Sequence, residues 1–313
     1  MTMLTAAVAA FSIAATFQTK PVPISERAVA TLEIPGSADF LVADGRAVWA
    51  TNEHRIEKLR HDRARPVGSV AVPGPCGAPV VAFGSLWVAN CQDSTVHRID
   101  RNALRVTAVI HTGLADPSGE LSLAAGAGSL WVLTSGSGTL SRIDPRTNRV
   151  VTRIAVAPNS YAAAFGFGSV WITNTNPQAG GVQRIDPATS RVLATIPVGP
   201  TPRFLAAGEG GVWTLNQGDG SVTRIDPKTN RVAATIAVGM DGTGGDIAAG
   251  AGRVWVRGKK TLLLAIDPAT NRELERFGPP AGSGAVRVAG DFVWVTAHDI
   301  HVVWVLRPER PPR

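Results

Sequence analysis

The sequence predicts an all-β protein built as a seven-bladed β-propeller of four-stranded blades, and three observations indicate that class. A Gly-x-[VL]-Trp tetrad or a close variant recurs seven times, and five of these units continue into an Ile-Asp pair. The tryptophans of the repeats are spaced by 38, 44, 40, 42, 42 and 39 residues. Repeats of about forty residues with four short strands each are typical of propeller blades. The seven residues are Trp49, Trp87, Trp131, Trp171, Trp213, Trp255 and Trp294.

The unit from Arg203 to Gly239 shows the predicted blade most clearly. Its four apolar runs, each bounded by Gly, Asn, Asp or Pro, are Phe204–Ala207, Gly211–Leu215, Ser221–Ile225 and Arg231–Val238. The turn from Asp226 to Asn230 contains Pro227, which presets φ, and its Asp and Asn side chains can accept bonds from nearby backbone N–H groups. We expect the Trp of each unit to pack against the neighbouring blade rather than to bind a ligand.

The ends of the repeat region predict how the ring closes. The last repeat supplies only three strands, Ala285–Gly290, Phe292–Thr296 and Ile300–Leu306. The segment from Arg27 to Pro35 matches the outermost strand that begins at Arg231. We therefore expect an N-terminal strand to complete blade seven, so that the propeller covers residues 27–308 and leaves no open seam.

Residues 1–26 are predicted to be a signal peptide, with a disordered leader as the alternative. Leu4–Thr16 is an apolar run of signal-peptide length, too short for a membrane span. Residues 309–313 are expected to be a disordered tail.

The two cysteines also indicate export. Cys76 lies in the loop that leads into blade two, and Cys91 follows that blade's second strand, so both should lie on one face. A Cys76–Cys91 disulfide would require an oxidising compartment, and two separate buried thiols are the alternative. The predicted localisation is secreted or periplasmic, within the cell envelope.

A net charge of +7 and a pI near 10.2 favour association with an anionic polymer, such as single-stranded nucleic acid or a wall polymer. Many of the arginines are internal to the repeats, however, and pairing with Asp on the same or the next blade is the alternative. Four of them precede the Ile-Asp pair, namely Arg98, Arg142, Arg184 and Arg224.

The repeats resemble a known family. Segments such as Trp171–Asn174 and Trp87–Asn90, followed by Arg-Ile-Asp-Pro and a Val-Ala-Thr-Ile-like strand, look like the YVTN family of bacterial β-propeller repeats, which is similar to the virginiamycin B lyase (streptogramin lyase) propellers. The likeness covers nearly the whole chain after residue 26. It implies a seven-bladed, often exported propeller, and its lyase branch implies a Mg²⁺-dependent elimination that uses His and Glu at the channel mouth.

The lyase residues do not carry over to the matching positions. The position ten residues before each Trp holds no His, and the position three residues after each Trp holds no Glu. A general base to abstract a proton next to a carbonyl is therefore missing where the resemblance places it.

Polar residues at those same positions predict a ligand site at the mouth of the axial channel. Asp39, Tyr161 and Arg203 lie ten residues before a Trp, and Asn52, Asn90, Asn174 and Asn216 lie three residues after one. Hydrogen-bonding groups around a concave mouth suit a small polar ligand. The alternative for the Asn side chains is that they satisfy backbone groups in turns.

Weaker catalytic and metal candidates come from adjacent blades. Glu53 and His54 of blade one should approach His298, Asp299 and His301 of blade seven, as an acid–base set or as ligands of a transition metal. Asp241 and Asp246, in the loop leading into blade six, are candidate oxygen ligands for Mg²⁺ or another divalent metal.

The sequence favours an exported, monomeric binding or interaction module, whose partner is a small polar ligand or another protein. The alternatives are a metal-dependent lyase of the streptogramin type or a lactonase-like hydrolase, and a basic propeller that binds an anionic polymer. The chain has no Gly-x-Ser-x-Gly elbow, phosphate loop or Cys-x-x-Cys pair, so those chemistries are excluded.

Overall fold

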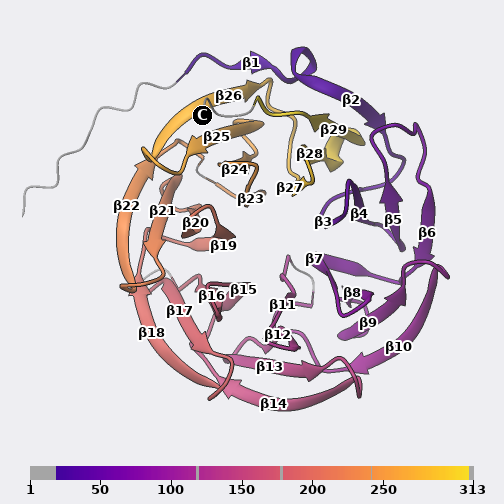
Figure 1. Cartoon of the computed structure of the whole chain (residues 1–313), viewed down its shortest axis with the longest axis vertical. Helices are drawn as coiled ribbons and strands as arrows, with labels where there is room; N and C mark the ends of the chain where they lie inside the picture. The colour runs from indigo at the N-terminus through magenta and orange to yellow at the C-terminus, as the bar shows by residue number, and fades with distance from the viewer. Residues whose placement is uncertain (1–18, 118–119, 177–178, 241, 310–313) are drawn as a thin grey trace, which may run out of the picture.

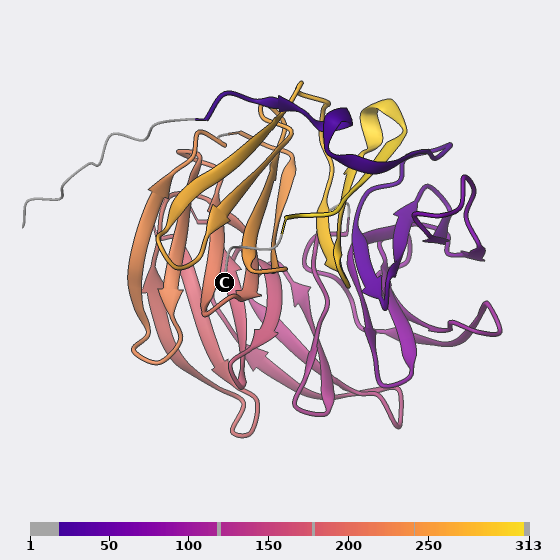
Figure 2. The same cartoon turned by 45° about the horizontal axis from the view of Figure 1, so that its top comes forward.

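The computed structural model describes residues 19–117, 120–176, 179–240 and 242–309, which form seven antiparallel sheets around one axis (Figure 1). In each sheet one strand lies next to the axis and the last lies at the periphery, and the tilted view shows the sheets as stacked blades (Figure 2). The predicted seven-bladed propeller is confirmed. Within the described ranges, no helix is long and apolar enough to cross a membrane.

The first four blades follow one another along the chain. Blade one contains β3 (Leu41–Asp44), β4 (Ala47–Asn52), β5 (Arg55–Leu59) and β6 (Gly68–Ala71). Blade two contains β7 (Pro75–Ala82), β8 (Ser85–Asn90), β9 (Thr95–Asp100) and β10 (Arg105–His111). Blade three contains β11 (Ala124–Gly126), β12 (Ser129–Ser135), β13 (Thr139–Asp144) and β14 (Arg149–Ala155). Blade four contains β15 (Ser160–Gly166), β16 (Ser169–Asn174), β17 (Gly181–Asp186) and β18 (Arg191–Pro197).

Blades five and six continue the pattern, and blade seven uses both ends of the chain. Blade five contains β19 (Pro202–Gly208), β20 (Gly211–Asn216), β21 (Ser221–Asp226) and β22 (Arg231–Ala237). Blade six contains β23 (Gly245–Gly250), β24 (Arg253–Gly258), β25 (Leu263–Asp267) and β26 (Arg272–Gly278). Blade seven contains β27 (Val286–Ala289), β28 (Phe292–Ala297) and β29 (Val302–Leu306), followed outward by β2 (Ala28–Glu33).

The N-terminal strand closes the ring as predicted. Strand β2 pairs antiparallel with β29, with Leu32 opposite Val303 and Glu33 opposite Val302. Leu32 is buried, so this contact adds apolar burial to the backbone ladder.

The described residues begin at Thr19, within the segment 1–26 that was predicted to be a leader. Strand β1 (Val22–Pro23) pairs in parallel with β26, which makes blade six five-stranded. The short 3₁₀ turn η1 (Ile24–Glu26) buries Ile24, and the backbone N–H of Thr19 donates to Glu273 at 3.2 Å. The apolar run Leu4–Thr16 and the tail beyond residue 309 lie outside the described residues.

The seven repeat tryptophans form the centres of the blade cores. All seven are among the largest fully buried side chains, as the packing interpretation predicts. The indole N–H of Trp213, for example, donates to Gly208 O at 3.0 Å, so its polar atom is satisfied inside the blade.

Arginine side chains join successive blades from blade two to blade six. Arg184 lies over the Trp171 ring with Cζ 4.9 Å from its centroid, and its Nη1 donates to Pro227 O at 2.7 Å and Asn230 Oδ1 at 2.8 Å. Similar contacts to the following blade's turn are made by Arg98, Arg142 and Arg224. The expected pairing with Asp is therefore wrong, because the acceptors are carbonyl and amide oxygens.

The turn aspartates have a local role instead. Asp226 accepts from the backbone N–H of Lys228 at 2.8 Å and from the hydroxyl of Thr229 at 3.0 Å, as an Asx-type turn does. Asp and Asn of the same turn thus have separate functions, because Asp226 holds its own turn and Asn230 binds the arginine of the preceding blade.

Candidate functional site

Aromatic side chains from three blades meet at the axis near one end of the channel. Phe40 precedes the innermost strand of blade one, and Phe204 lies on that of blade five, yet their ring centroids are 6.4 Å apart. Tyr161 of blade four meets the Phe204 ring edge-on at 6.0 Å. We call these three residues the aromatic floor, and the end of the channel at which they lie the mouth.

Beneath the aromatic floor lies a chamber of about 270 Å³, lined largely by alanines of the innermost strands. Its charged groups are Asp246 and Arg287, whose Oδ2 and Nη2 atoms are 3.2 Å apart. Asp246 also accepts from the backbone N–H groups of Ile247 and Val286. Burial raises the pKa of Asp246. Since its oxygens already bind protein donors, Asp246 does not fit the predicted role of metal ligand.

One cluster of polar side chains at the mouth connects blades three, four and five. The hydroxyl of Tyr161 donates to Glu120 Oε2 at 3.1 Å, and Arg203 Nη2 lies 2.7 Å from that hydroxyl and 3.0 Å from the Glu120 carboxylate. Burial, reinforced by the negative charge of Glu120, raises the pKa of Tyr161. The structure thus places the predicted Tyr161 and Arg203 together and adds Glu120 to them.

A second cluster of polar side chains at the mouth connects blades one and seven. His298, in the 3₁₀ turn η2 (His298–Ile300), has Nδ1 3.7 Å from Asp39 Oδ2 and Nε2 3.1 Å from Asp299 Oδ1. The Ser37 hydroxyl lies 3.5 Å from Nδ1. Burial lowers the pKa of His298, and the charge of Asp299 opposes that shift.

Asp39 is the most strongly perturbed carboxyl group of the mouth. Burial, together with the charges of Glu120 and Asp246, raises the pKa of Asp39 to about 7. Its side chain retains 23% exposure, so it is reachable from solvent. The positive charge of Arg257 opposes this rise, and Arg257 is itself fully buried and donates to carbonyl oxygens such as Thr296 O at 3.2 Å. Burial lowers the pKa of Arg257 to about 10.

The four asparagines hold loops rather than face the mouth. All four are buried. Asn52 Oδ1 accepts from the backbone N–H groups of Ser37 and Glu53, and its Nδ2 donates to Pro35 O. Asn90 accepts from Gly74, Asn174 accepts from Asn176, and Asn216 donates to Ser221 and Thr223. Their contacts match the alternative in which they satisfy backbone and neighbouring side-chain groups in turns.

The remaining histidine and acidic candidates do not join the mouth group. His54 Nδ1 contacts Pro73 O at 2.7 Å, next to blade two, and His301 Nδ1 contacts Gly36 O. Glu53 is exposed, and Asp241 lies outside the described residues. Across the described part of the chain, no three or more His, Cys, Asp or Glu side chains form a group that could hold a metal ion. The described residues therefore do not fit the divalent metal that the resemblance implies.

Sequence reasoning missed Glu120, Phe40 and Phe204. Glu120 lies eleven residues before Trp131, one position away from the place searched, and the preceding repeat spacing of 44 residues is the longest of the six. An insertion in that connection was therefore the available signal. Phe40 and Phe204 each directly follow a residue that was selected, but their contact across the axis has no sequence signature.

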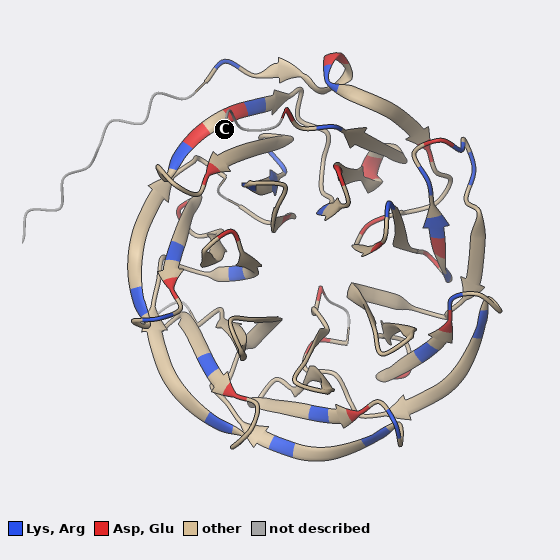
Figure 3. Cartoon of the chain, viewed as in Figure 1, with Lys and Arg blue, Asp and Glu red and all other residues tan. Residues whose placement is uncertain are grey.

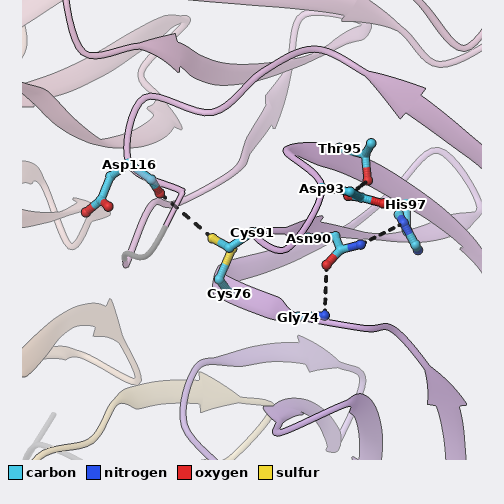
Figure 4. The surroundings of a disulfide bond; sticks show 8 residues. All are labelled: Gly74, Cys76, Asn90, Cys91, Asp93, Thr95, His97 and Asp116. Atoms are coloured by element: carbon cyan, nitrogen blue, oxygen red, sulfur yellow. Dashed lines mark hydrogen bonds between the residues drawn. A yellow bond between two sulfur atoms is a disulfide. The ribbon is translucent and has the colours of Figure 1, made fainter.

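The predicted Cys76–Cys91 disulfide is present, and its two cysteines have a sequence separation of 15 (Figure 4). It joins the start of β7 to the residue after β8. Figure 4 also shows Asn90 beside it, bound to the backbone of Gly74 and to His97.

Comparisons with known proteins support the fold. No family model and no curated protein sequence matches the chain. Among solved structures, the chain is similar to virginiamycin B lyase from Staphylococcus aureus, with a TM-score of 0.71 and 13% identity over 89% of this chain and 98% of that one. Hydrazine synthase of Kuenenia stuttgartiensis gives 0.71 and 16% over 89% and 97%, and BamB from Moraxella catarrhalis gives 0.63 and 12% over 88% and 85%.

These similarities establish a shared propeller fold, in agreement with the architecture that the repeat resemblance implies. At identities of this size they show the fold alone, and proteins of one fold have unrelated functions. Function must be argued from the residues of the mouth.

Proposed function

We propose that this protein is an exported binding module that holds a small polar ligand in the mouth of its axial channel. The observation that carries the proposal is the convergence of polar side chains from five blades above the aromatic floor. These side chains are Asp39, Glu120, Tyr161, Arg203, His298 and Asp299. A concave site with an apolar base and a few convergent polar groups is the usual form of a small-molecule site.

The charges of the mouth favour a ligand with a cationic or hydrogen-bond-donating group. Arg203 pairs with Glu120, whereas Asp39 and Asp299 face only His298 among the side chains within ion-pair distance in the described residues. Burial, reinforced by the neighbouring carboxyl groups, raises the pKa of Asp39. A cation bound beside Asp39 would favour its ionised form, while the aromatic floor would accept the apolar part of the ligand.

A matched ligand series tests the proposal by isothermal titration calorimetry. Putrescine, 1,4-butanediol and succinate share a four-carbon chain and are cationic, neutral and anionic, respectively. Further polar compounds of each charge can be added to these three arms of the series. We expect the cationic arm to bind, and we expect Asp39→Asn and Glu120→Gln to weaken that binding at least tenfold. Asp62→Asn is the control, because Asp62 pairs only with Arg60 and Arg63 on the surface. Equal binding by the mouth variants and the unaltered protein would place the ligand elsewhere and refute the proposal.

An acid–base enzyme is a second candidate, supported by His298. A histidine held between two carboxyl groups can transfer a proton without a metal. A lyase of the streptogramin type or a lactonase-like hydrolase would need such a group. Incubation of the protein with a streptogramin B or a lactone, with and without Mg²⁺, followed by mass spectrometry, tests this alternative, and His298→Asn is the control for chemistry at the mouth.

Binding of an anionic polymer is a third candidate, supported by the outermost strands. Five of them begin with an exposed arginine, at the strand ends opposite the mouth; these residues are Arg105, Arg149, Arg191, Arg231 and Arg272. Figure 3 shows Lys and Arg along the outer strands around much of the ring. Retention on a polyuridylate or heparin column that falls steeply with salt would support this candidate.

Export is part of the proposal and is supported by the disulfide, because disulfides persist in oxidising compartments. Expression in a secretion-competent host, followed by N-terminal mass spectrometry of the exported protein, tests both export and cleavage. Recovery of the intact chain from the cytoplasm alone would contradict it.

A further inference from the structure

The disulfide lies against the connection that carries Glu120. Cys76 begins a bulge in β7, because the pairing with β8 shifts register between Cys76 and Val80. The bulged residues Gly77 and Ala78 face the segment that leads into blade three. Cys91 Sγ also lies 3.8 Å from Asp116 O, on the same connection (Figure 4).

Two backbone contacts join the bulge to that segment. The backbone N–H of Leu123 donates to Ala78 O at 3.1 Å. Gly77 has φ +64, and a Cβ atom built on it would lie 1.4 Å from Leu121 O. The two backbones are therefore so close that only glycine fits there. Leu121 and Leu123 are buried, which fixes the segment from the other side.

Glu120 directly precedes Leu121 and ends this chain of contacts. Its carboxylate accepts from Tyr161 and Arg203, so it joins blade three to blades four and five at the mouth. The connection to the disulfide is short, since Cys76 is bonded to Gly77, Gly77 touches Leu121, and Leu121 is bonded to Glu120.

We propose that the Cys76–Cys91 disulfide positions Glu120, so that reduction of this bond releases the Glu120 carboxylate from Tyr161 and Arg203. This inference rests on the proposed function of the mouth. In the reaction an external dithiol donates two electrons and two protons, the Sγ–Sγ bond breaks, two cysteine thiols form, and the dithiol becomes a disulfide. Both cysteines are only partly buried, so a dithiol can reach them.

Tyr161 reports on this coupling without any ligand, because it is the only tyrosine in the chain. The Tyr161 hydroxyl donates to the Glu120 carboxylate, so displacement of Glu120 changes the hydrogen bonding of that hydroxyl. We would compare the ¹³Cζ chemical shift of labelled Tyr161 at neutral pH in the oxidised protein, the dithiothreitol-reduced protein and the Cys76→Ser/Cys91→Ser variant. The expected result is the same change of this chemical shift in both disulfide-free forms.

Glu120→Gln provides the matched control. It should change the Tyr161 chemical shift as reduction does, and reduction should add little in its background, as a double-mutant cycle requires for one shared interaction. An unchanged Tyr161 chemical shift after reduction would overturn the inference. Equal shifts on reduction with and without Glu120 would also overturn it, because the disulfide would then act by another route.

If the serine variant does not fold, hydrogen exchange of the reduced native protein provides a second test. Native protein reduced well below its unfolding temperature should exchange faster at Leu121–Ala125 while the blade-five strands stay protected. Unchanged protection of that segment would contradict the proposal. Because neither readout uses a ligand, the coupling can fail while ligand binding stands, and ligand binding can fail while the coupling stands.

Discussion

The rings of Phe40 and Phe204 meet across the propeller axis, with centroids 6.4 Å apart, although 164 residues separate them in the sequence (204 − 40). Phe40 belongs to the loop leading into blade one and Phe204 to the innermost strand of blade five. Their contact places apolar rings at the axis, next to the polar side chains of the mouth.

Removal of one ring should open the channel and weaken the fold. Phe204 is fully buried, and truncation of such a side chain costs about 3–5 kcal/mol. Phe204→Ala is therefore expected to lower the free energy of unfolding by that amount in urea denaturation. Phe83→Ala is the matched control, because Phe83 is 40% exposed on a hairpin tip and should change stability little. A similar loss in both variants would contradict the role given to the aromatic floor.

Asp39 should destabilise the folded protein at neutral and alkaline pH. Its carboxyl binds a proton more tightly in the folded state, with a pKa near 7, than in the unfolded chain, where the value is 3.8. The free energy of unfolding should thus fall as pH rises from about 4 to about 7 and remain low above that range. Asp39→Asn is expected to stabilise the protein at pH 8 by on the order of 2–4 kcal/mol, with allowance for partial exposure.

Asp44→Asn is the control for this pH effect and should act in the opposite direction. Burial opposes ionisation of Asp44, but bonds from Lys58 and Trp49 prevail, and its pKa lies below the ordinary value. Its contribution to stability is present above the unfolded pKa and is lost as pH falls through the folded pKa. Thermal unfolding of both variants between about pH 2 and pH 8 measures the two signs, and a destabilised Asp39→Asn protein at pH 8 would refute the interpretation of Asp39.

The N-terminal strand should be required for cooperative folding. Deletion of the chain through residue 36 removes β2, exposes the edge of β29 and opens the ring between blades one and seven. We expect a large fall in melting temperature with a broadened transition. A chain shortened only through residue 18 is the control, and Leu32→Ser with Ile34→Ser tests the same contact without a deletion, because both side chains are buried. Unchanged cooperative melting of the longer deletion would contradict the closure mechanism.

The arginine contacts between blades should contribute measurably to stability. Arg184→Ala removes three hydrogen bonds from a charged group, two of them to blade five, and its contact with the Trp171 ring. The expected loss is about 2 kcal/mol in denaturant unfolding. Arg191→Ala, at an exposed outer-strand position, should change stability by less than about 0.5 kcal/mol. Equal effects at the two positions would show that the inter-blade contact contributes nothing specific.

The sequence determined the architecture because each repeat has the same pattern of strands and the same turn residues. The Gly-x-[VL]-Trp tetrads and Asp-Pro turns predicted the blade-five strands to within two residues at each end. The likeness of Arg27–Pro35 to the strand at Arg231 predicted closure, and the spacing of Cys76 and Cys91 predicted the disulfide. These features depend on alternation, turn chemistry and blade topology, all of which are visible along the chain.

Only the tertiary structure decided which polar residues meet. Asn52 and Arg203 were both predicted to face the mouth, yet Asn52 is bound within its own loop while Arg203 reaches the mouth. Glu120 joins Tyr161 because an insertion carries it there, and Phe40 meets Phe204 because seven blades bring their inner strands to one axis. Side-chain direction in loops and contacts across the axis depend on the closed ring as a whole, so no single repeat contains them.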